Sequence, residues 1–143
     1  MAECRIGVVG VGKMGEYHVG VLSDMREAEL VGIVDSDQKR AKIVSERYKT
    51  SNFKDYKDLF KKVDAVVIAV PTSMHYSIGK EFIEAGIHTL LEKPCTDDLR
   101  QAEELFDIAA KKNVTLHIGH VERFNGAVQE LFKIVKDPIY IEC

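Results

Sequence analysis

A glycine-rich stretch near the amino terminus is the first feature of this sequence that could do chemistry. It runs from residue 10 to residue 15 as GVGKMG, after a short segment rich in Val and Ile. In the pattern GxGxxG the first glycine permits a tight turn, the second lets backbone N–H groups approach a diphosphate, and the third lets the next helix pack closely. The same residues could form a purely structural turn, but their place between a strand-like and a helix-like segment favours dinucleotide binding. The predicted contacts are Gly10, Val11, Gly12, Lys13, Met14 and Gly15.

An aspartate ends the second strand-like segment, twenty residues after the last of these glycines. A carboxylate at that place, here Asp35, can accept hydrogen bonds from the hydroxyl groups of an adenosine ribose. It would also repel a 2′-phosphate, by roughly 1 kcal/mol in water and about 4 kcal/mol at an effective dielectric constant of 20. Asp35, with Ser36 beside it, therefore favours NAD over NADP as the cofactor, whereas Lys39 and Arg40, one helical turn further on, leave NADP open. The alternative role for Asp35 is an N-cap of the following helix.

Other polar residues gather where the later strand-like segments stop. Because parallel strands end at one edge of a sheet, and open α/β sheets bind ligands outside that edge, we expect these residues to line an active crevice. A lone histidine is more often a packing or surface residue, and His18 and His117 are interpreted in that way. The residues predicted to line the crevice are Val70, Pro71, Thr72, His75, Glu92, Lys93, His120 and Arg123.

Lys93 and His120 are the candidate catalytic residues of this group. Lys93 stands between a buried strand-like segment and a proline, and its ammonium could polarise a carbonyl or hydroxyl oxygen or hold a negative substrate group. The alternative is an exposed lysine in a loop. His120 could exchange a proton with a sugar hydroxyl. Arg123, three residues further on, could hold a phosphate or carboxamide group.

The elements that must position these residues alternate along the chain. Helix-like segments are expected at residues 13–24, 37–48, 55–61, 73–85, 97–111 and 125–136. Strand-like segments are expected at residues 5–10, 30–35, 52–53, 64–70, 88–92 and 114–120, with a further candidate at 139–142. This alternation predicts a single α/β domain over residues 1–138, a doubly wound parallel sheet of the Rossmann type. The expected buried stripe of the helix at 97–111 is Leu99, Ala102, Leu105, Phe106 and Ala109.

Composition narrows the class of protein. The chain has 143 residues, of which 45% are apolar and 30% charged, with a formal net charge of −3. These values are typical of a soluble globular protein and give no support to a nucleic-acid or membrane partner. The longest apolar run, Ala65 to Val70, is far shorter than the roughly 18 residues of a membrane-spanning helix. Three scattered cysteines, without a signal-peptide pattern or a Cys/His cluster, favour a cytoplasmic protein and predict no metal site.

Five stretches together resemble the N-terminal NAD(P)-binding domain of the glucose–fructose oxidoreductase and inositol 2-dehydrogenase (Gfo/Idh/MocA) family. They are GVGKMGEYH at 10–18, VDSD at 34–37, VPTSMHYS at 70–77, LLEKPC at 90–95 and GHVERFN at 119–125. The resemblance implies a Rossmann fold, NAD(P) as the cofactor, and hydride transfer at a secondary hydroxyl of a sugar, cyclitol or nucleotide-sugar.

The resemblance also implies roles for individual residues. The three glycines would hold the pyrophosphate and Asp35 the adenosine ribose, while Thr72 and His75 would line the nucleotide. Glu92 would contact the nicotinamide ribose, and Lys93 matches the active-site lysine of the family. Arg123 matches a residue at the edge of the active site.

Length separates this sequence from the family it resembles. Family members are more than twice as long and add an α+β domain that carries a general acid/base histidine, most substrate contacts and the oligomer interface. We therefore expect residues 139–143 to begin a truncated second domain, so that a missing substrate domain or a homo-oligomer would complete the site. The alternatives are a dinucleotide-binding module with little or no catalysis of its own, and another doubly wound protein such as a methyltransferase or a receiver-like switch.

Overall fold

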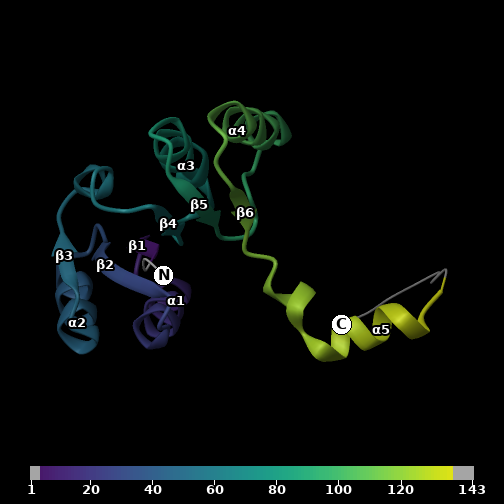
Figure 1. Cartoon of the computed structure of the whole chain (residues 1–143), viewed down its shortest axis with the longest axis horizontal. Helices are drawn as coiled ribbons and strands as arrows, with labels where there is room; N and C mark the ends of the chain where they lie inside the picture. The colour runs from purple at the N-terminus through teal and green to yellow at the C-terminus, as the bar shows by residue number, and fades with distance from the viewer. Residues whose placement is uncertain (1–3, 137–143) are drawn as a thin grey trace.

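The computed structural model describes residues 4–136 and forms a six-stranded sheet in the order β3-β2-β1-β4-β5-β6 (Figure 1). Every neighbouring pair of strands is parallel. From β1 the chain adds β2 and β3 toward one edge of the sheet. It then returns to place β4 on the other side of β1 and adds β5 and β6 toward the opposite edge. The order in which strands are added therefore reverses between β1 and β4. The predicted doubly wound Rossmann fold is confirmed. The strands are β1 (Cys4–Val9), β2 (Ala28–Val34), β3 (Ser51–Phe53), β4 (Ala65–Ile68), β5 (His88–Leu91) and β6 (Leu116–Ile118).

Helices cover both faces of the sheet, with α1 and α2 on one side and α3 and α4 on the other (Figure 1). The segment predicted as a helix at 55–61 is only a 3₁₀ turn, and the one predicted at 73–85 begins as a 3₁₀ turn before it becomes α3. The candidate strand at 139–142 and the expected start of a second domain lie outside the described residues. The helices are α1 (Lys13–Asp24), α2 (Gln38–Tyr48), α3 (His75–Glu84), α4 (Leu99–Lys112) and α5 (Gly126–Ile134), and the 3₁₀ turns are η1 (Tyr56–Leu59), η2 (Thr72–Met74) and η3 (Val121–Phe124).

Two apolar clusters, one on each face of the sheet, hold these layers together. Leu59 and Phe82 are fully buried in the cluster under α3 and α4, and Val19 and Ile33 are fully buried in the cluster under α1 and α2. Burial of a side chain of this size contributes about 1.5–3 kcal/mol. The central strands read as continuous apolar runs because both of their faces are covered.

The buried stripe predicted for α4 is only partly correct. Leu105 and Ala109 are buried, but Leu99 is 75% exposed and Phe106 is 47% exposed. Leu99 is the first residue of the helix, directly after its N-cap Asp98, and lies beyond the edge of the core. Phe106 follows Leu105 and so points about 100° away from it around the helix axis, which turns the ring toward solvent.

α5 lies apart from the sheet and from the other helices (Figure 1). Its side chains Leu131, Phe132 and Ile134 are exposed. A separate cavity of about 340 Å³ lies over β4, β5 and β6 on the α1 side of the sheet, and its walls include His18 and Leu90. In residues 4–136, no helix combines the length and the apolar character needed to cross a membrane.

Candidate functional site

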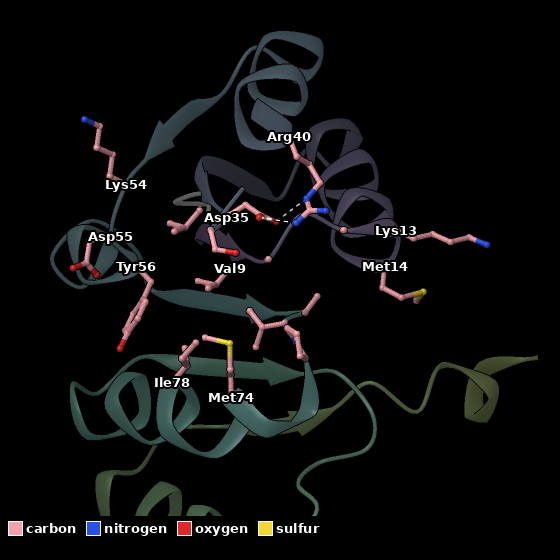
Figure 2. A pocket seen from close by; sticks show the side chains of 17 residues that line it. Val9, Lys13, Met14, Asp35, Arg40, Lys54, Asp55, Tyr56, Met74 and Ile78 are labelled. Atoms are coloured by element: carbon pink, nitrogen blue, oxygen red, sulfur yellow. Dashed lines mark hydrogen bonds and ion pairs between the residues drawn. The ribbon is translucent and has the colours of Figure 1, made fainter. Parts of the chain in front are cut away.

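A cavity of about 670 Å³ opens where β1, β2 and β4 end (Figure 2). Its walls come from the loop before α1, the start of α2, the segment after β3, and η2 with α3. A cavity of this size suits a small-molecule ligand or cofactor. It lies where the strand order reverses, which is the place where open α/β sheets bind their ligands.

The three glycines of the loop between β1 and α1 are required for three different reasons. Gly10 has a φ of +85°, and a Cβ there would stand 2.6 Å from the carbonyl oxygen of Ala69. A Cβ on Gly15 would stand 1.8 Å from the carbonyl oxygen of Gly10, so this glycine allows α1 to approach the loop. A Cβ on Gly12 would have none of the described atoms within 4 Å. Gly12 therefore leaves open space at the cavity, where a ligand could approach the backbone.

The amino-terminal end of α1 is free to bind an anion. Its N-cap is Gly12, and no side chain of the described residues caps the helix. The neighbouring helix α2 differs, because the Asp37 carboxylate accepts hydrogen bonds from the Lys39 and Arg40 amides. The first N–H groups of α1 therefore remain available to an anion in the cavity. The helix dipole adds about 0.3–1 kcal/mol to such binding.

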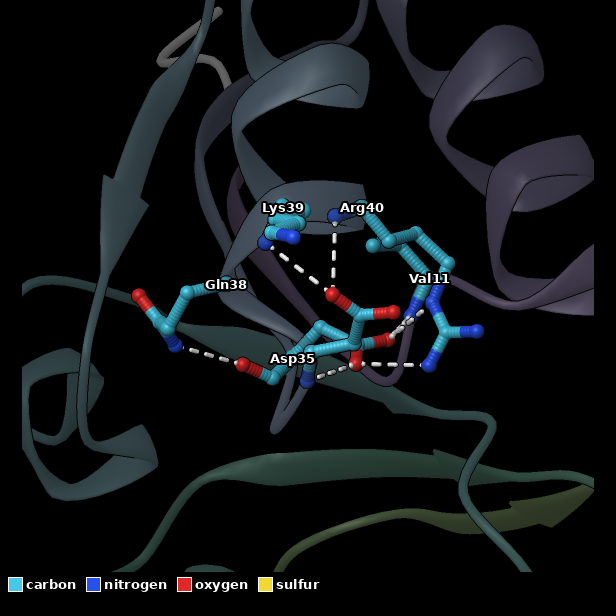
Figure 3. Close-up of polar contacts among 6 residues, drawn as sticks. Val11, Asp35, Gln38, Lys39 and Arg40 are labelled. Atoms are coloured by element: carbon cyan, nitrogen blue, oxygen red, sulfur yellow. Dashed lines mark hydrogen bonds and ion pairs between the residues drawn. The ribbon is translucent and has the colours of Figure 1, made fainter.

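The Asp35 carboxylate stands at the end of β2, 5% exposed, and is held by four hydrogen bonds (Figure 3). Oδ2 accepts from the Val11 amide at 2.8 Å and from Arg40 Nε at 3.1 Å. Oδ1 accepts from the Asp37 amide and from Arg40 Nη2, both at 2.8 Å. Burial by itself would raise the pKa of Asp35, but the hydrogen bonds from Arg40, Val11 and Asp37 outweigh it and hold the pKa below its ordinary value. The carboxylate is therefore ionised at neutral pH.

A second group of polar residues lies at the same sheet edge, where β5 and β6 end. Glu92 is buried, and its Oε2 accepts a hydrogen bond from the Lys93 amide at 3.1 Å. Its Oε1 lies 2.8 Å from Nε2 of His18, which is carried by α1. A Cβ on Gly119 would stand 2.9 Å from Glu92 Oε1, so this glycine after β6 leaves room for the carboxylate. The pair joins the first helix to the backbone that carries Lys93.

These features match a known family. Residues 4–120 match the model of the Gfo/Idh/MocA family, described as oxidoreductases with an NAD-binding Rossmann fold. The chain belongs to this family. It is 35% identical over 131 residues to a UDP-N-acetylglucosamine 3-dehydrogenase of Acidithiobacillus ferrooxidans, covering 92% of this chain and 41% of that protein. It is 31% identical over 137 residues to an inositol 2-dehydrogenase of Corynebacterium glutamicum, and the match covers 92% of this chain and 41% of that protein.

Solved structures of Gfo/Idh/MocA proteins agree with this match. The UDP-N-acetylglucosamine 3-dehydrogenase of A. ferrooxidans superposes with a TM-score of 0.87 at 34% identity, covering 93% of this chain and 43% of that one. GenD2 from gentamicin A biosynthesis, in complex with NAD, gives a TM-score of 0.80 at 28% identity, and the match covers 83% of this chain and 35% of that one. The chain thus spans about two fifths of the length of the curated relatives it matches.

Most of the residues predicted to bind the cofactor line the cavity. They are Gly10, Gly12, Lys13, Met14, Asp35, Ser36, Val70 and Pro71. Val11 and Gly15 are not part of the cavity wall. The Val11 amide donates a hydrogen bond to the Asp35 carboxylate, and Gly15 allows α1 to pack close to the loop. The cavity also includes residues that sequence reasoning did not assign to the site, among them Lys54, Asp55, Tyr56, Met74 and Ile78. The segment 54–56 directly follows β3, so the rule that ligands meet strand ends could have found it.

The cavity does not include the remaining predicted residues. Lys93, His120 and Arg123 are exposed, and Thr72 is partly buried outside the cavity wall. Glu92 is in contact with His18, which the sequence analysis interprets as a packing or surface residue. The roles of these residues toward the cofactor and substrate stay predictions.

The prediction that the His75 side chain lines the nucleotide needs correction. The ring is only 1% exposed and does not reach the cavity. Nδ1 lies 2.9 Å from the carbonyl oxygen of Pro94, and Nε2 lies 2.9 Å from that of Val70. His75 therefore ties the segment after β4 to the segment after β5. The spacing of His75 from Pro71 placed it at the start of a helix but did not show that its ring turns inward.

Proposed function

We propose that this chain is the dinucleotide-binding domain, predicted over residues 1–138, of an oxidoreductase that uses NAD. The reaction would be hydride transfer at a secondary hydroxyl group of a sugar, cyclitol or nucleotide-sugar. One observation carries the proposal above all others. A buried, ionised Asp35 and the uncapped start of α1 meet at one cavity, separated by a loop whose Gly12 leaves open space.

The cavity residues fit the two polar parts of NAD. The N–H groups at the start of α1, around Gly12 and Lys13, suit the diphosphate, because a glycine loop and a helix N-terminus both favour anions. Asp35 suits the adenosine ribose, since hydrogen bonds to a charged carboxylate contribute about 1.5–3 kcal/mol each. Its negative charge favours NAD over NADP, which adds a phosphate to that ribose. When bound, NAD supplies the hydride acceptor for alcohol oxidation.

Lys93 and His120 are the residues we assign to the reaction itself. A lysine ammonium near the reacting hydroxyl would stabilise negative charge on its oxygen, and an imidazole could take up the proton. Glu92 is proposed to contact the nicotinamide ribose, Thr72 to line the nucleotide, and Arg123 to lie at the edge of the active site. Relatives of this chain are named as dehydrogenases of UDP-N-acetylglucosamine and of inositol, which supports a polyhydroxylated substrate.

The first experiment is a fluorescence titration of the chain with NADH. We expect saturable binding, which Asp35→Ala weakens because the ribose loses its acceptor. A chain that takes up no NADH at millimolar concentration would overturn the proposal. Incubation with NAD and a panel of sugars, cyclitols and nucleotide-sugars, followed by the absorbance of NADH, then tests for turnover.

A second candidate function is a dinucleotide-binding module with little or no catalysis of its own. The exposure of Lys93, His120 and Arg123 favours it, because a reacting hydroxyl group is usually held where water is excluded. NADH binding without turnover of any substrate in the panel would select this candidate. Turnover that appears only when a substrate domain or a second copy of the chain is present would show that the missing walls come from a partner.

A further inference from the structure

The segment 93–97, which carries Lys93, connects the end of β5 to the start of α4. Nδ1 of His75 lies 2.9 Å from the carbonyl oxygen of Pro94 and 3.2 Å from that of Cys95. Among the described residues, these contacts are the only hydrogen bonds that join the segment to a part of the fold distant in sequence, because its other hydrogen bonds are local. The placement of the segment therefore depends on His75.

The other side of the His75 ring contacts the wall of the cofactor cavity. Nε2 lies 2.9 Å from the carbonyl oxygen of Val70, a residue that lines the cavity. Met74, directly before His75, and Ile78, about one helical turn after it, line the same cavity (Figure 2). His75 thus lies behind a wall that its own neighbours form, with the segment that carries Lys93 on its far side.

The imidazole of His75 suits a link between two segments because it is a rigid ring and only 1% exposed. All three of its hydrogen-bond partners are carbonyl oxygens. A neutral ring donates to one side, and a protonated ring donates to both. In either form the enclosed ring stays in contact with both segments. A displacement of the cavity wall therefore moves the ring, and the ring then moves against the segment 93–97.

We propose that His75 is a positioning residue that links occupation of the cofactor cavity to the placement of Lys93. A ligand shifts an equilibrium toward the arrangement that it binds better. A dinucleotide packed against the wall at Val70 and Met74 favours the closed arrangement, in which the ring holds the segment 93–97. Lys93 is then held most firmly when the hydride acceptor is bound. This inference rests on the proposed function, because it requires that the cavity binds a dinucleotide.

Cys95 reports on the segment in the unaltered chain. Its side chain is partly buried and packs against the apolar cluster under α3 and α4. Burial raises the pKa of the Cys95 thiol, and the thiolate is the form that reacts. Alkylation should therefore be slow while the segment is closed and faster when it opens locally. Cys4 is exposed at the end of β1 that is remote from the cavity, and it serves as an internal reference.

The test is alkylation by iodoacetamide with and without saturating NADH, followed by peptide mass spectrometry that separates Cys95 from Cys4. A fluorescence titration sets the saturating NADH concentration for each variant. In the unaltered chain, NADH should slow the alkylation of Cys95 at least roughly 5-fold, the lower end of the usual coupling between sites, and leave that of Cys4 unchanged. In His75→Gln, Cys95 should react at least roughly 10-fold faster, because the bridging ring is lost, and NADH should no longer slow the reaction.

His117→Gln is the matched control, because it makes the same substitution at an exposed histidine of β6. It should keep the effect of NADH on Cys95. Unfolding in urea checks that each variant is folded. Amide hydrogen exchange of Lys93 and Cys95 in the unaltered chain needs no variant, and NADH should slow it. This measurement decides the matter if His75→Gln does not fold.

Three results would overturn the inference. They are bound NADH that leaves the alkylation and amide exchange of the segment unchanged, NADH that still protects Cys95 in His75→Gln, and an equal loss of protection in His117→Gln. A purely structural role of His75 would give the second result, because Cys95 would react faster by the same factor with and without NADH. In each case NADH still binds, so the proposed function stands while the role of His75 falls. Failure of the unaltered chain to bind NADH would instead remove the proposed function.

Discussion

The cavity at the ends of β1, β2 and β4 and the sheet edge at β5 and β6 are built in different ways. In the cavity, the groups proposed to bind the cofactor are backbone amides and the Asp35 carboxylate, which two backbone amides and Arg40 hold in place. At β5 and β6, Lys93, His120 and Arg123 are exposed side chains. The glycine loop and Asp35 belong to one β-α-β unit, and the other walls of the cavity come from α2, the segment after β3, and α3. In the second region the candidate catalytic side chains are exposed, and few residues enclose them.

This contrast follows from how each region is specified. A glycine loop and the helix after it fix their donors through local backbone geometry, which neighbouring residues determine. A reaction site must hold flexible side chains and exclude water, which requires packing from several segments. α5 lies apart from the sheet (Figure 1). A cavity with mostly apolar walls lies beside β5. We therefore expect substitutions in the two regions to affect different properties.

The largest effect should come from Gly15→Ala in the cavity region. The new Cβ would meet the Gly10 carbonyl oxygen at 1.8 Å, so α1 or the loop must shift. We expect the free energy of unfolding to fall by roughly 1–3 kcal/mol or more, and NADH binding to be lost with the loop geometry.

Gly20→Ala is the matched control for this prediction, because it makes the same substitution in the same helix. Its Cβ would lie 3.4 Å from the Tyr48 hydroxyl oxygen, a contact that a small adjustment can relieve. Alanine favours a helix interior by about 0.5–1 kcal/mol over glycine. Urea unfolding should separate the two variants, and equal stability would contradict the close packing of α1 against the loop.

A smaller and more selective effect is expected from Gly12→Ala. Its Cβ would enter the open space at the cavity, where no described atom lies within 4 Å, so the fold should be unaffected. The methyl group would stand where we propose that the diphosphate approaches, and we expect NADH to bind at least roughly 10-fold more weakly, or about 1.4 kcal/mol.

Gly126→Ala is the control, since a Cβ at this helix start also meets no described atom within 4 Å. It should change neither thermal stability nor NADH affinity. A Gly12→Ala variant that binds NADH normally would show that the loop does not hold the diphosphate, and the contrast between the two regions would lose its basis.

We expect a fall in pH to lower the free energy of unfolding, with a smaller effect than that of the two glycine substitutions. The pKa of Asp35 in the folded chain lies below the ordinary value of 3.8. Its hydrogen bonds therefore contribute stability that is complete above that value and is lost as the pH falls through the folded-state pKa. Asp64, paired with Arg5 on the surface, behaves in the same direction with a pKa of about 2.

Urea unfolding between pH 7 and pH 2 checks this prediction. Asp35→Asn should flatten the acid part of the stability profile relative to the unaltered chain. In high salt the contribution of Asp64 should fade, because exposed ion pairs are screened, while that of the buried Asp35 carboxylate should persist. An unchanged acid slope in Asp35→Asn would mean that the carboxylate is not held as described.

How much the sequence could predict also follows the division between the two regions. The start of α1 at Lys13 and the place of Asp35 at the end of β2 were predicted correctly, because glycine spacing and short apolar runs are local signals. The Arg40 contact with Asp35 and the inward turn of His75 were not predicted. Both depend on which way a side chain rotates after the fold is complete, and a helical position does not determine this.

The positions of large apolar side chains show the same limit. Leu99 and Phe106 have the spacing of a buried stripe but lie at the end and on the flank of α4. Tyr56 lines the cavity, and its position just after a strand is a local signal that shows a strand end but not which other strands lie beside it. Its place depends on β3 pairing beside β2, which is a long-range contact. Periodicity along a helix or strand cannot show where the layer beneath it ends.

The smallest effect on binding is expected from Lys93→Ala, and for that reason this variant tests the contrast most directly. Lys93 is exposed and outside the cavity, so both the free energy of unfolding and the NADH affinity should stay nearly unchanged. Any turnover of a sugar or cyclitol, by the chain alone or with a partner, should disappear if the ammonium stabilises charge on the reacting oxygen. Lys111→Ala, on the exposed end of α4, is the control and should leave turnover intact. Loss of NADH binding together with turnover in Lys93→Ala would place this lysine in the cofactor site, and the two regions would then have to be described as one.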